Sequence, residues 1–468
     1  MVRLAILLFA LGISGLAYLY GVASTKFGLF PANVVEEAWL AAKALREAWN
    51  SDFQDRPPGA VALSSEPPIL TDAGAGDIPP ADEGLILMTG APDVLTTHCP
   101  ELGCLAWLMD RSGKIYHVWP IDPAIDWGET LSGFNSIENI IPHGSHVFDN
   151  GDLLVSFQGR NTFPFGVGLA KFDKDGQLLW KSESNVHHWF DIDEEGNIFT
   201  PAHRLIDSPL QIGVMERELV CADKKIYDDL VEVFAQDGEV LEQFSLTEVM
   251  IDSGYGSLLE LTRNDCDPLH LNDVEVLDAA DAAAYPRFAA GDLLVSINSL
   301  NAIAVLDGTT KQVKWLISGM MSYQHNPRFS GDNKILVFDN RAGEARQGGS
   351  RLVEIDVGTH EFEAIFPHEA TPDEIDFYTS VAGHFDMNEE RDRALVSLSL
   401  QGRVLEIDLE AGEVLWEFEN VHDVARYLEA EGKEADTDYA IFGITGAYYA
   451  GVPAFLESAG RTQQASDS

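Results

Sequence analysis

The chain has 468 residues and is strongly acidic, because 76 Asp and Glu outnumber 30 Lys and Arg and leave a net charge of −46. A nucleic-acid-binding protein needs a basic face to displace phosphate counterions, so that class is excluded. Docking on anionic lipid through a polybasic patch is disfavoured for the same reason. Hydrophobic residues make up 46% of the chain, which is enough for an ordinary buried core.

The N-terminal segment, 1–31, predicts a membrane anchor or an export signal. Residues 4–23 carry no charged side chain, and twenty helical residues rise about 30 Å, enough to cross a bilayer as a transmembrane helix. A cleaved secretory signal is the alternative, although the apolar run is long for one and no small-residue cleavage site follows. In both cases we expect the rest of the chain outside the cytoplasm, in a periplasmic or extracellular space.

Residues 32–84 predict a short helix and a Pro-rich linker. Asn33 and Glu36 have the spacing of a capping box at a helix start. Proline pairs then recur at 57–58, 67–68 and 79–80, and proline lacks the N–H group that helices and sheets need. We therefore expect a stalk between the membrane and the next domain. At the other end, 451–468 predicts a polar tail.

Between residues 85 and 450 one pattern occurs six times: an apolar strand, an Asp-containing turn, and a second strand that often ends in Trp. Clear copies are 172–180 and 407–416. Several antiparallel four-stranded units in series, without helices between them, predict an all-β fold, a six-bladed β-propeller. A pair of β-sandwiches is the alternative, but two domains would not explain six similar units. Residues 439–444 follow the last copy and are expected to help close the ring.

Histidines recur at one position of the repeat, shortly before a turn. His146, His188, His325 and His384 share this placement, and His270 has it with an insertion before the turn. The innermost strands of a propeller line its central channel, so these imidazoles are expected to converge there. Such a group suits metal binding, or nucleophilic and acid–base chemistry.

Three segments carry a family resemblance: Val186-His187-His188-Trp189-Phe190-Asp191, Leu269-His270-Leu271-Asn272-Asp273, and Tyr323-Gln324-His325-Asn326-Pro327-Arg328-Phe329. Together they resemble the arylsulfotransferase family, the PAPS-independent aryl-sulfate sulfotransferases built on six-bladed propellers. The resemblance covers roughly 85–450 and does not extend to the anchor or the stalk.

The resemblance implies a ping-pong transfer of a sulfuryl group from an aryl sulfate to a phenol, through a sulfohistidine. His325 matches the nucleophile, His270 lies beside it, and the pair His187 and His188 supplies a further imidazole. The positions expected to contact substrate are Asn272, Asn298, Arg328 and His384. No metal and no cofactor is implied, and the partners are the two small molecules and the membrane.

One departure from the family pattern bears on activity. Relatives carry an Arg at the end of a Ser-x-Arg run, and this chain has Asn298 there, in Ser296-Ile297-Asn298. An amide does not supply the charge that an Arg fork brings to a tetrahedral oxyanion. Arg328 or Arg341 is a candidate substitute. A catalytically impaired propeller that binds a protein partner as a scaffold therefore stays open, as does a metal-dependent hydrolase or lyase.

The four cysteines allow two disulfides in an oxidising compartment. Cys99 and Cys104 are expected to form a small-loop bond. Cys221 and Cys266 pair only if insertions from two repeats meet. The tyrosines at 448 and 449 suit either a phenol pocket or packing where the ring closes.

Overall fold

The computed structural model describes residues 18, 20–21, 57, 59–74, 77, 79–80, 83–92, 96, 105–121, 125, 127, 140–159, 166–182, 184–207, 210–211, 218–219, 221, 225–341, 349–368 and 376–456. The chain divides into two compact units, Met1–Arg56 with Lys433–Ala435, and Pro57–Gly432 with Asp436–Ser468. The second unit holds all of the large sheets among the described residues.

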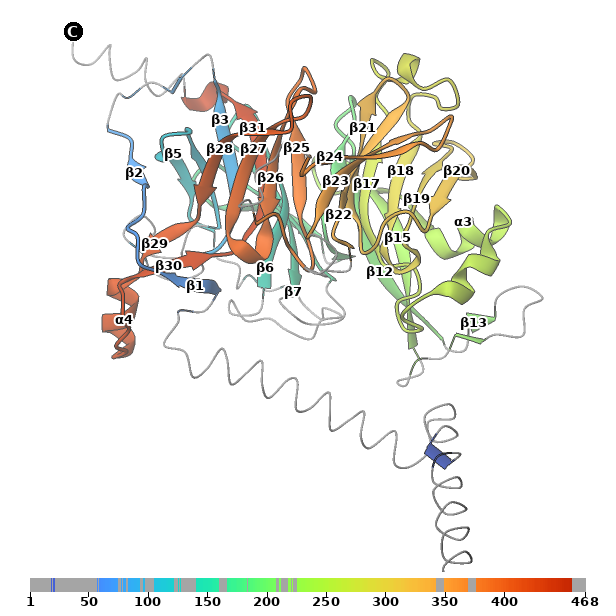
Figure 1. Ribbon diagram of the computed structural model, residues 1–468, viewed down its shortest axis with the longest axis horizontal. Helices are drawn as coiled ribbons and strands as arrows, with labels where there is room; N and C mark the ends of the chain where they lie inside the picture. Colours follow the sequence, from blue (N-terminus) through green and yellow to red (C-terminus); the bar gives the residue numbers. More distant parts are fainter. Residues whose placement is uncertain are drawn as a thin grey trace, which may run out of the picture. The chain divides into compact units, whose positions relative to one another are not determined.

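Six sheets of four or five strands occupy this part of the chain (Figure 1). In the first, the order is β2 (Thr71–Asp72), β5 (Lys114–Trp119), β4 (Ala106–Met109), β3 (Leu85–Gly90) and β31 (Ile444–Gly451). The second runs β6 (Ile140–Val147), β7 (Leu153–Gly159), β8 (Gly166–Phe172) and β9 (Leu178–Ser182). The third runs β10 (Asn185–Val186), β12 (Ile198–Asp207), β15 (Lys225–Phe234) and β16 (Val240–Ser245), with β11 (Asp191–Ile192) also paired to β12.

The last three large sheets are four-stranded meanders in chain order. They comprise β17 (Leu271–Val276), β18 (Leu293–Ile297), β19 (Ala302–Leu306) and β20 (Val313–Ser318); β21 (His325–Gly331), β22 (Lys334–Asp339), β23 (Arg351–Asp356) and β24 (Phe362–Phe366); and β25 (His384–Met387), β26 (Arg393–Leu398), β27 (Arg403–Asp408) and β28 (Glu413–Glu419).

Smaller elements lie between and beside these sheets. Two short sheets hold β1 (Ala60–Ser64), β30 (Tyr439–Phe442) and β29 (Val421–Asp423), and β13 (Leu210–Gln211) with β14 (Glu218–Leu219). The short helices are α3 (Leu246–Asp252), α4 (Ala425–Glu431), η2 (Gly256–Leu261), η3 (Ala282–Ala284), η4 (Asn298–Leu300) and η7 (Ser399–Gln401).

Each of the six large sheets contacts the next, and the series of contacts returns to its start. β12 contacts β17, β17 contacts β21, β21 contacts β25, β25 contacts β31, β31 contacts β6, and β10 contacts β7 and β8. The described part of the chain is therefore all-β, and its sheets fit the predicted propeller. Alternating apolar residues on each strand fill the space between sheets, as Leu293, Val295 and Ile297 do on β18.

The Trp that ends many repeats links one sheet to the next. Its indole N–H donates to a turn of the following sheet in Trp119 to Gly151 O (3.0 Å), Trp180 to Gln236 O (2.9 Å) and Trp416 to Arg111 O (2.8 Å). A buried indole needs such an acceptor. The third bond joins the last sheet to the first, so the recurring Trp is a device for joining sheets.

The recurring Asp has a local role in its turn. The Asp173 carboxylate accepts from the backbone N–H groups of Asp175 and Gln177, at 2.9 and 2.8 Å. Asp408 does the same for Glu410 and Ala411, at 3.0 and 2.7 Å. These are Asx turns, in which a short carboxylate satisfies amides that the bend leaves unpaired.

Acidic side chains on the inner strands hold neighbouring sheets together. Three of them accept a backbone N–H from the next sheet: Asp191 from Val276 (2.8 Å), Glu275 from Phe329 (2.7 Å) and Asp386 from Tyr449 (2.8 Å). Each carboxylate satisfies a donor that has no ladder partner at that point.

Two expectations for the ends of the predicted propeller are corrected. The strand that pairs with β3 is β31, which shares only Ile444 with the stretch expected to close the ring, 439–444, whereas most of that stretch forms β30 and pairs with β1 and β29. Part of the expected linker also folds onto the second unit, because β1 pairs with β30 and β2 pairs in parallel with β5. Prolines separate these short strands without preventing their pairing.

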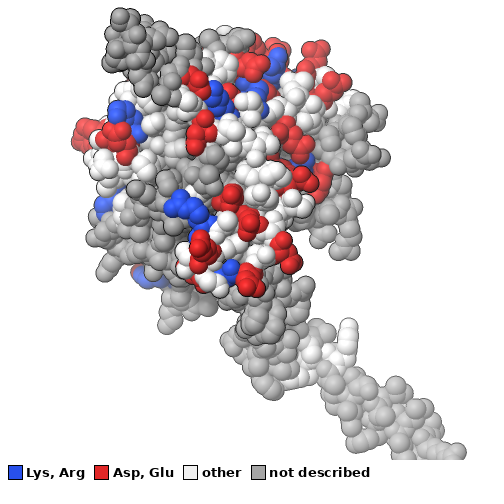
Figure 2. Space-filling model, turned by 90° about the vertical axis from the view of Figure 1, so that its left-hand side faces the viewer, with Lys and Arg blue, Asp and Glu red and all other residues white. Residues whose placement is uncertain are grey.

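The expected transmembrane segment, the capping box at 33–36, the polar tail beyond residue 456 and the Cys99–Cys104 bond lie outside the described residues, apart from residues 18 and 20–21 of the apolar run. Among the residues that are described, no helix has the length and apolar character needed to span a membrane. Figure 2 shows one face on which acidic side chains form several groups with single basic residues between them.

Candidate active site at the histidine cluster

Four aromatic side chains from three sheets meet at one place. The ring of His188 lies 5.2 Å from that of His270 and 6.3 Å from that of His325, measured between centroids. The indole of Trp189 stands 5.9 Å from His325, edge to face. The structure thus brings together the histidines of all three family segments, which lie up to 138 positions apart in the sequence (325 − 187).

The backbone at these positions is unusual. His188 and His270 have φ values of +59° and +52°, and Tyr323 and Ala382 have +59° and +56°. His188 and His270 are themselves the recurring histidines, and Tyr323 and Ala382 come two residues before His325 and His384. Non-glycine residues rarely adopt this left-handed region, which costs on the order of 1 kcal/mol or more. A conformation repeated at four sheets sets the direction in which the imidazoles point.

His325 has a defined tautomer. Its Nδ1 lies 2.7 Å from Oδ1 of Asn340. The Asn340 amide donates both of its N–H groups to backbone carbonyls, those of Thr379 (3.0 Å) and Ala382 (2.7 Å). Its oxygen must therefore face His325, so Nδ1 carries the proton and Nε2 keeps the lone pair. Burial lowers the pKa of His325 to about 4, which keeps the ring neutral at neutral pH.

His270 is paired with a buried carboxylate three residues earlier. Asp267 accepts a hydrogen bond from Nδ1 of His270 and is 1% exposed. Burial opposes the charged form of this imidazole, but the charges of Asp267 and Asp229 outweigh it and raise the pKa of His270. One imidazole of the cluster is thus held neutral and another is held ready to carry a proton.

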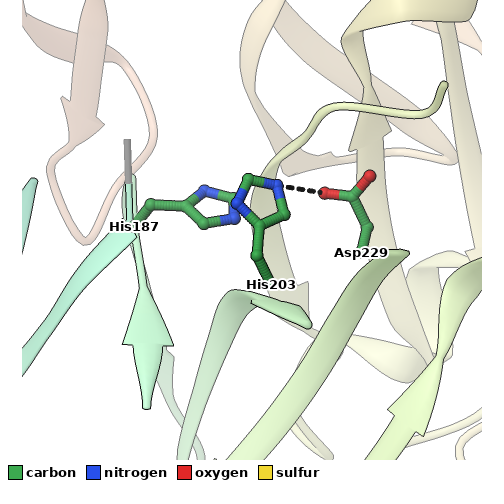
Figure 3. A group of neighbouring side chains, drawn as sticks. All are labelled: His187, His203 and Asp229. Carbon is green, nitrogen blue, oxygen red and sulfur yellow. Dashed lines mark ion pairs between the residues drawn. The ribbon is translucent and has the colours of Figure 1, made fainter. Parts of the chain in front are cut away.

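Behind His188 lies a second, fully enclosed layer. Nδ1 of His187 and Nδ1 of His188 are 2.6 Å apart, so one donates to the other. The ring of His203 lies 3.9 Å from that of His187 between centroids, with the two planes tilted by 30°, and its Nε2 lies 3.2 Å from Oδ1 of Asp229 (Figure 3). Burial lowers the pKa of both His187 and His188 well below the usual value.

The two asparagines expected to contact substrate have another partner. Nδ2 of Asn272 and Nδ2 of Asn298 each donate to the backbone carbonyl of Gln324, both at 2.9 Å. Gln324 directly precedes His325, so the two amides fix the backbone that carries this histidine. Position 298 thus acts on the cluster through the backbone.

A cation does reach position 298, from a loop that the sequence did not indicate. The guanidinium of Arg263 donates to Oδ1 of Asn298 (2.7 Å) and to its backbone carbonyl. It also lies over the ring of Tyr323, 3.5 Å from the centroid. Its charge helps to lower the pKa of His325 after burial. Arg263 thus brings a positive charge to position 298, beside the cluster.

The other arginines face elsewhere. Arg328 donates to Asp273 at 2.7 Å and is largely buried, with 16% of its side chain exposed. Burial opposes its charge, but Asp273 and Glu275 outweigh this and raise the pKa of Arg328. Its charge therefore interacts with carboxylates of the inner strands. Arg341 lies beside Arg351 and Asp339 instead.

The remaining expected residues border the cluster. The ring of His384 stacks on Trp189 at 5.4 Å and contacts Tyr448 at 4.8 Å. Tyr448 accepts at its hydroxyl from the backbone of Ser145 (3.3 Å), and Tyr449 donates to Glu406 (3.1 Å). Both tyrosines therefore serve contacts between strands.

The second sheet contributes a different histidine from the one expected. His146 is exposed and lies 4.7 Å from Phe148. His143, three residues earlier on β6, lies 5.4 Å from His188 and 4.2 Å from Trp189 instead. The strand register is irregular between Pro142 and Ser145, so counting from the turn selects the wrong residue.

A disulfide supports the loop that carries Arg263 and Asp267. Cys221 and Cys266 are bonded, with Cα atoms 4.8 Å apart. The backbone carbonyl of Cys266 also accepts from the N–H of Tyr227 on β15, at 2.8 Å. The insertions of two repeats therefore meet, as the pairing of Cys221 with Cys266 requires.

Comparison with known proteins places the chain in a family. The model of the arylsulfotransferase (ASST) family matches residues 145–421, more than half of the chain. The match spans all three family segments. The chain belongs to the arylsulfotransferase family.

Other comparisons are more distant. No curated protein matches the chain. Among solved structures, a protein of unknown function from Bacteroides caccae has 11% identity and a TM-score of 0.44, covering 78% of this chain and 98% of that one. Virginiamycin B lyase from Staphylococcus aureus has 12% identity and a TM-score of 0.33, covering 59% and 69%. A chain of the nidogen/laminin complex has 9% identity and a TM-score of 0.40, covering 78% and 98%.

Proposed function

We propose that this protein is an active sulfotransferase that moves a sulfuryl group from an aryl sulfate to a phenol. The observation that carries the proposal is the fixed tautomer of His325, whose Nε2 lone pair lies in a cluster with His188 and His270. Membership of the arylsulfotransferase family supports the same reaction class. A neutral imidazole is a competent nucleophile at neutral pH.

In the first half-reaction, Nε2 of His325 forms a bond to sulfur while the bond from sulfur to the aryl oxygen breaks. The leaving phenolate takes a proton from His270, which its bond to Asp267 keeps available as an imidazolium. The products are a free phenol and N-sulfohistidine. General acid catalysis of this kind typically contributes about 10²–10⁴ in rate.

In the second half-reaction the same groups act in reverse. His270, now neutral, accepts the proton of the acceptor phenol. The phenolate oxygen bonds to sulfur, the bond from sulfur to nitrogen breaks, and His325 regains its lone pair. Asp267 keeps the His270 ring in one orientation throughout, as the carboxylate of a catalytic triad does for its histidine.

We assign charge stabilisation at the non-bridging sulfuryl oxygens to Arg263. A guanidinium is the natural donor to a tetrahedral oxyanion, and Arg263 reaches the position where relatives carry their Arg. This contact argues for activity and against the impaired-scaffold alternative, which rested on the neutral amide at Asn298.

We also propose that the six sheets form a six-bladed propeller that works outside the cytoplasm. The Cys221–Cys266 disulfide supports an oxidising compartment, and the apolar run at 4–23 supports a membrane anchor or an export signal.

The test is an assay of the purified full-length chain with 4-nitrophenyl sulfate as donor and a panel of phenols as acceptors. Nitrophenol release that depends on the acceptor is expected. A His422→Ala variant is the matched control, because His422 is also buried but lies on β29, bonded to Asn420. Folded protein that releases no nitrophenol with any acceptor would contradict the proposal.

A further inference from the structure

Three buried side chains of the third sheet converge beside the cluster, and none of them forms a bond to substrate or transfers a proton in the proposed reaction. His187 follows β10, His203 lies on β12 and Asp229 lies on β15. One ligand atom from each lies within 4.8 Å of the others. Figure 3 shows the two rings together, with the carboxylate at the edge of His203. Their exposed fractions are 0%, 3% and 0%.

Rigid strands hold this arrangement. His203 and Asp229 are directly opposite each other in the β12–β15 ladder, so their side chains leave the sheet on the same face. His187 is tied to the neighbouring backbone by its N–H, which donates to Pro201 O at 3.1 Å. The backbone thus presents two imidazoles and a carboxylate to one point without needing a loop to close.

Several polar atoms here lack hydrogen-bond partners. Nε2 of His187, both ring nitrogens of His203 and Oδ2 of Asp229 are buried and unpaired in hydrogen-bond geometry. His203 Nε2 has ion-pair contacts to Asp229 Oδ1 at 3.2 Å and to Asp267 Oδ1 at 3.9 Å, and Asp229 Oδ1 already accepts from Leu271 N–H at 2.9 Å. A buried polar atom without a hydrogen-bond partner destabilises the folded chain, so this group favours a bound ligand.

We infer that His187, His203 and Asp229 bind a divalent transition-metal ion, with Zn²⁺ the best match, at a buried structural site. Two imidazole nitrogens and one carboxylate oxygen are ligands that zinc accepts at about 2.0–2.2 Å. A divalent ion would also balance the buried carboxylate charge. The site is enclosed, so the ion joins β10, β12 and β15 and does not meet substrate.

The ion would also act on the cluster next to it. Nδ1 of His187 contacts Nδ1 of His188. Coordination through Nε2 leaves the proton on Nδ1 of His187, which then donates to His188, as the second nitrogen of a metal-bound histidine usually does to a neighbour. The ion would thereby fix the orientation of His188.

The test uses Zn²⁺ and Co²⁺ alone as probes on the full-length chain. The protein is stripped with EDTA, desalted and checked for folding, and metal is then counted by mass spectrometry after gel filtration. About one Zn²⁺ per chain is expected, with a rise in melting temperature. Co²⁺ should give visible absorption bands that Zn²⁺ abolishes.

Variants then test the ligands. His203→Asn and Asp229→Asn should each lower metal binding at least about tenfold, because each removes a donor. Asn at 229 keeps an oxygen for Leu271 N–H. His422→Asn, at a buried histidine outside the site, should still bind one equivalent.

Two results would overturn the inference. One is folded wild-type protein that binds under about a tenth of an equivalent of either ion, a measurement that stands even if a variant does not fold. The other is undiminished binding by both ligand variants. Neither bears on sulfuryl transfer, because donor turnover is measured separately and a metal site does not require it.

Discussion

The inner strands carry two layers of polar residues, one of histidines and one of acidic residues around Arg328. The histidine layer, at the start of the strands, combines left-handed backbone with one imidazole kept neutral and another kept protonatable. The acidic layer lies two to five residues further on and surrounds Arg328 with carboxylates such as Asp273 and Glu275. Its members bond backbone amides of the next sheet.

The difference shows how one set of strands serves two purposes. Side chains of the acidic layer interact with Arg328 and with backbone amides of the next sheet, so they hold the sheets together. The histidine layer keeps a lone pair and a proton donor available, and it receives its cation from the surface loop that carries Arg263. If the two layers serve these separate purposes, replacing Arg328 should lower stability, whereas replacing Arg263 should lower activity.

The largest effect is expected in the acidic layer. Arg328→Met leaves Asp273 buried without its cation, and breaking such a pair costs about 3–5 kcal/mol of unfolding free energy. Urea denaturation measures it. Lys174→Met, which removes an exposed pair with Asp175, should cost at most about 1 kcal/mol. Equal losses for the two variants would show that Arg328 is not structural.

In the histidine layer, Arg263→Ala should lower kcat/KM for 4-nitrophenyl sulfate by about 10²–10³, the usual effect of losing one oxyanion donor. The melting temperature should hardly change, because Arg263 is exposed. Arg263→Lys should restore part of the rate. Arg341→Ala is the matched control and should keep its activity; the reverse pattern would move the cation to Arg341.

The acidic layer also makes stability depend on pH. Burial raises the pKa of Glu275 to about 8, whereas an unfolded Glu titrates near 4.3. Between these values the folded chain holds a proton that the unfolded chain has lost, so stability falls as pH rises and the penalty is complete above about pH 8.

Glu275→Gln removes this titration. The variant should gain about 4 kcal/mol relative to wild type between pH 5 and pH 9, measured from urea midpoints at both values. A difference that does not change with pH would show that Glu275 is ionised in the folded protein at pH 5 already.

The smallest effect is a displaced acid limb in the rate profile. Burial, with the charges of His270 and Arg263, lowers the pKa of His325 to about 4. The nucleophile should stay neutral below the usual range of histidine, so the fall of kcat/KM towards acid should centre near pH 4 and not near pH 6.5. A limb at 6.5 would place the titration on an exposed imidazole.

Much of the fold and the cluster was predictable from the sequence, for physical reasons. The repeated Asp and Trp are strong signals because each makes the same bond in several sheets. The segments around His188, His270 and His325 predicted the cluster for another reason: equivalent positions of a repeat are expected to lie close together.

The rest depended on contacts that no local pattern encodes. Arg263 reaches Asn298 through an insertion, and a disulfide over 45 positions holds that insertion in place. Asp229 meets His203 only through the register of β12 and β15. His143 takes the place expected for His146 because the strand is irregular there. The bounds of β31 did not follow from the stretch expected at 439–444, because its partner β3 lies near the other end of the chain.

The central claim is that His325 carries the sulfuryl group between donor and acceptor. Rapid mixing with 4-nitrophenyl sulfate in the absence of a phenol, followed by peptide mass spectrometry under alkaline conditions, tests it directly. We predict a burst of one nitrophenol per chain and one sulfuryl group on the peptide that contains His325, with both absent in His325→Ala. Turnover without a labelled peptide, or a label on another histidine, would contradict the account.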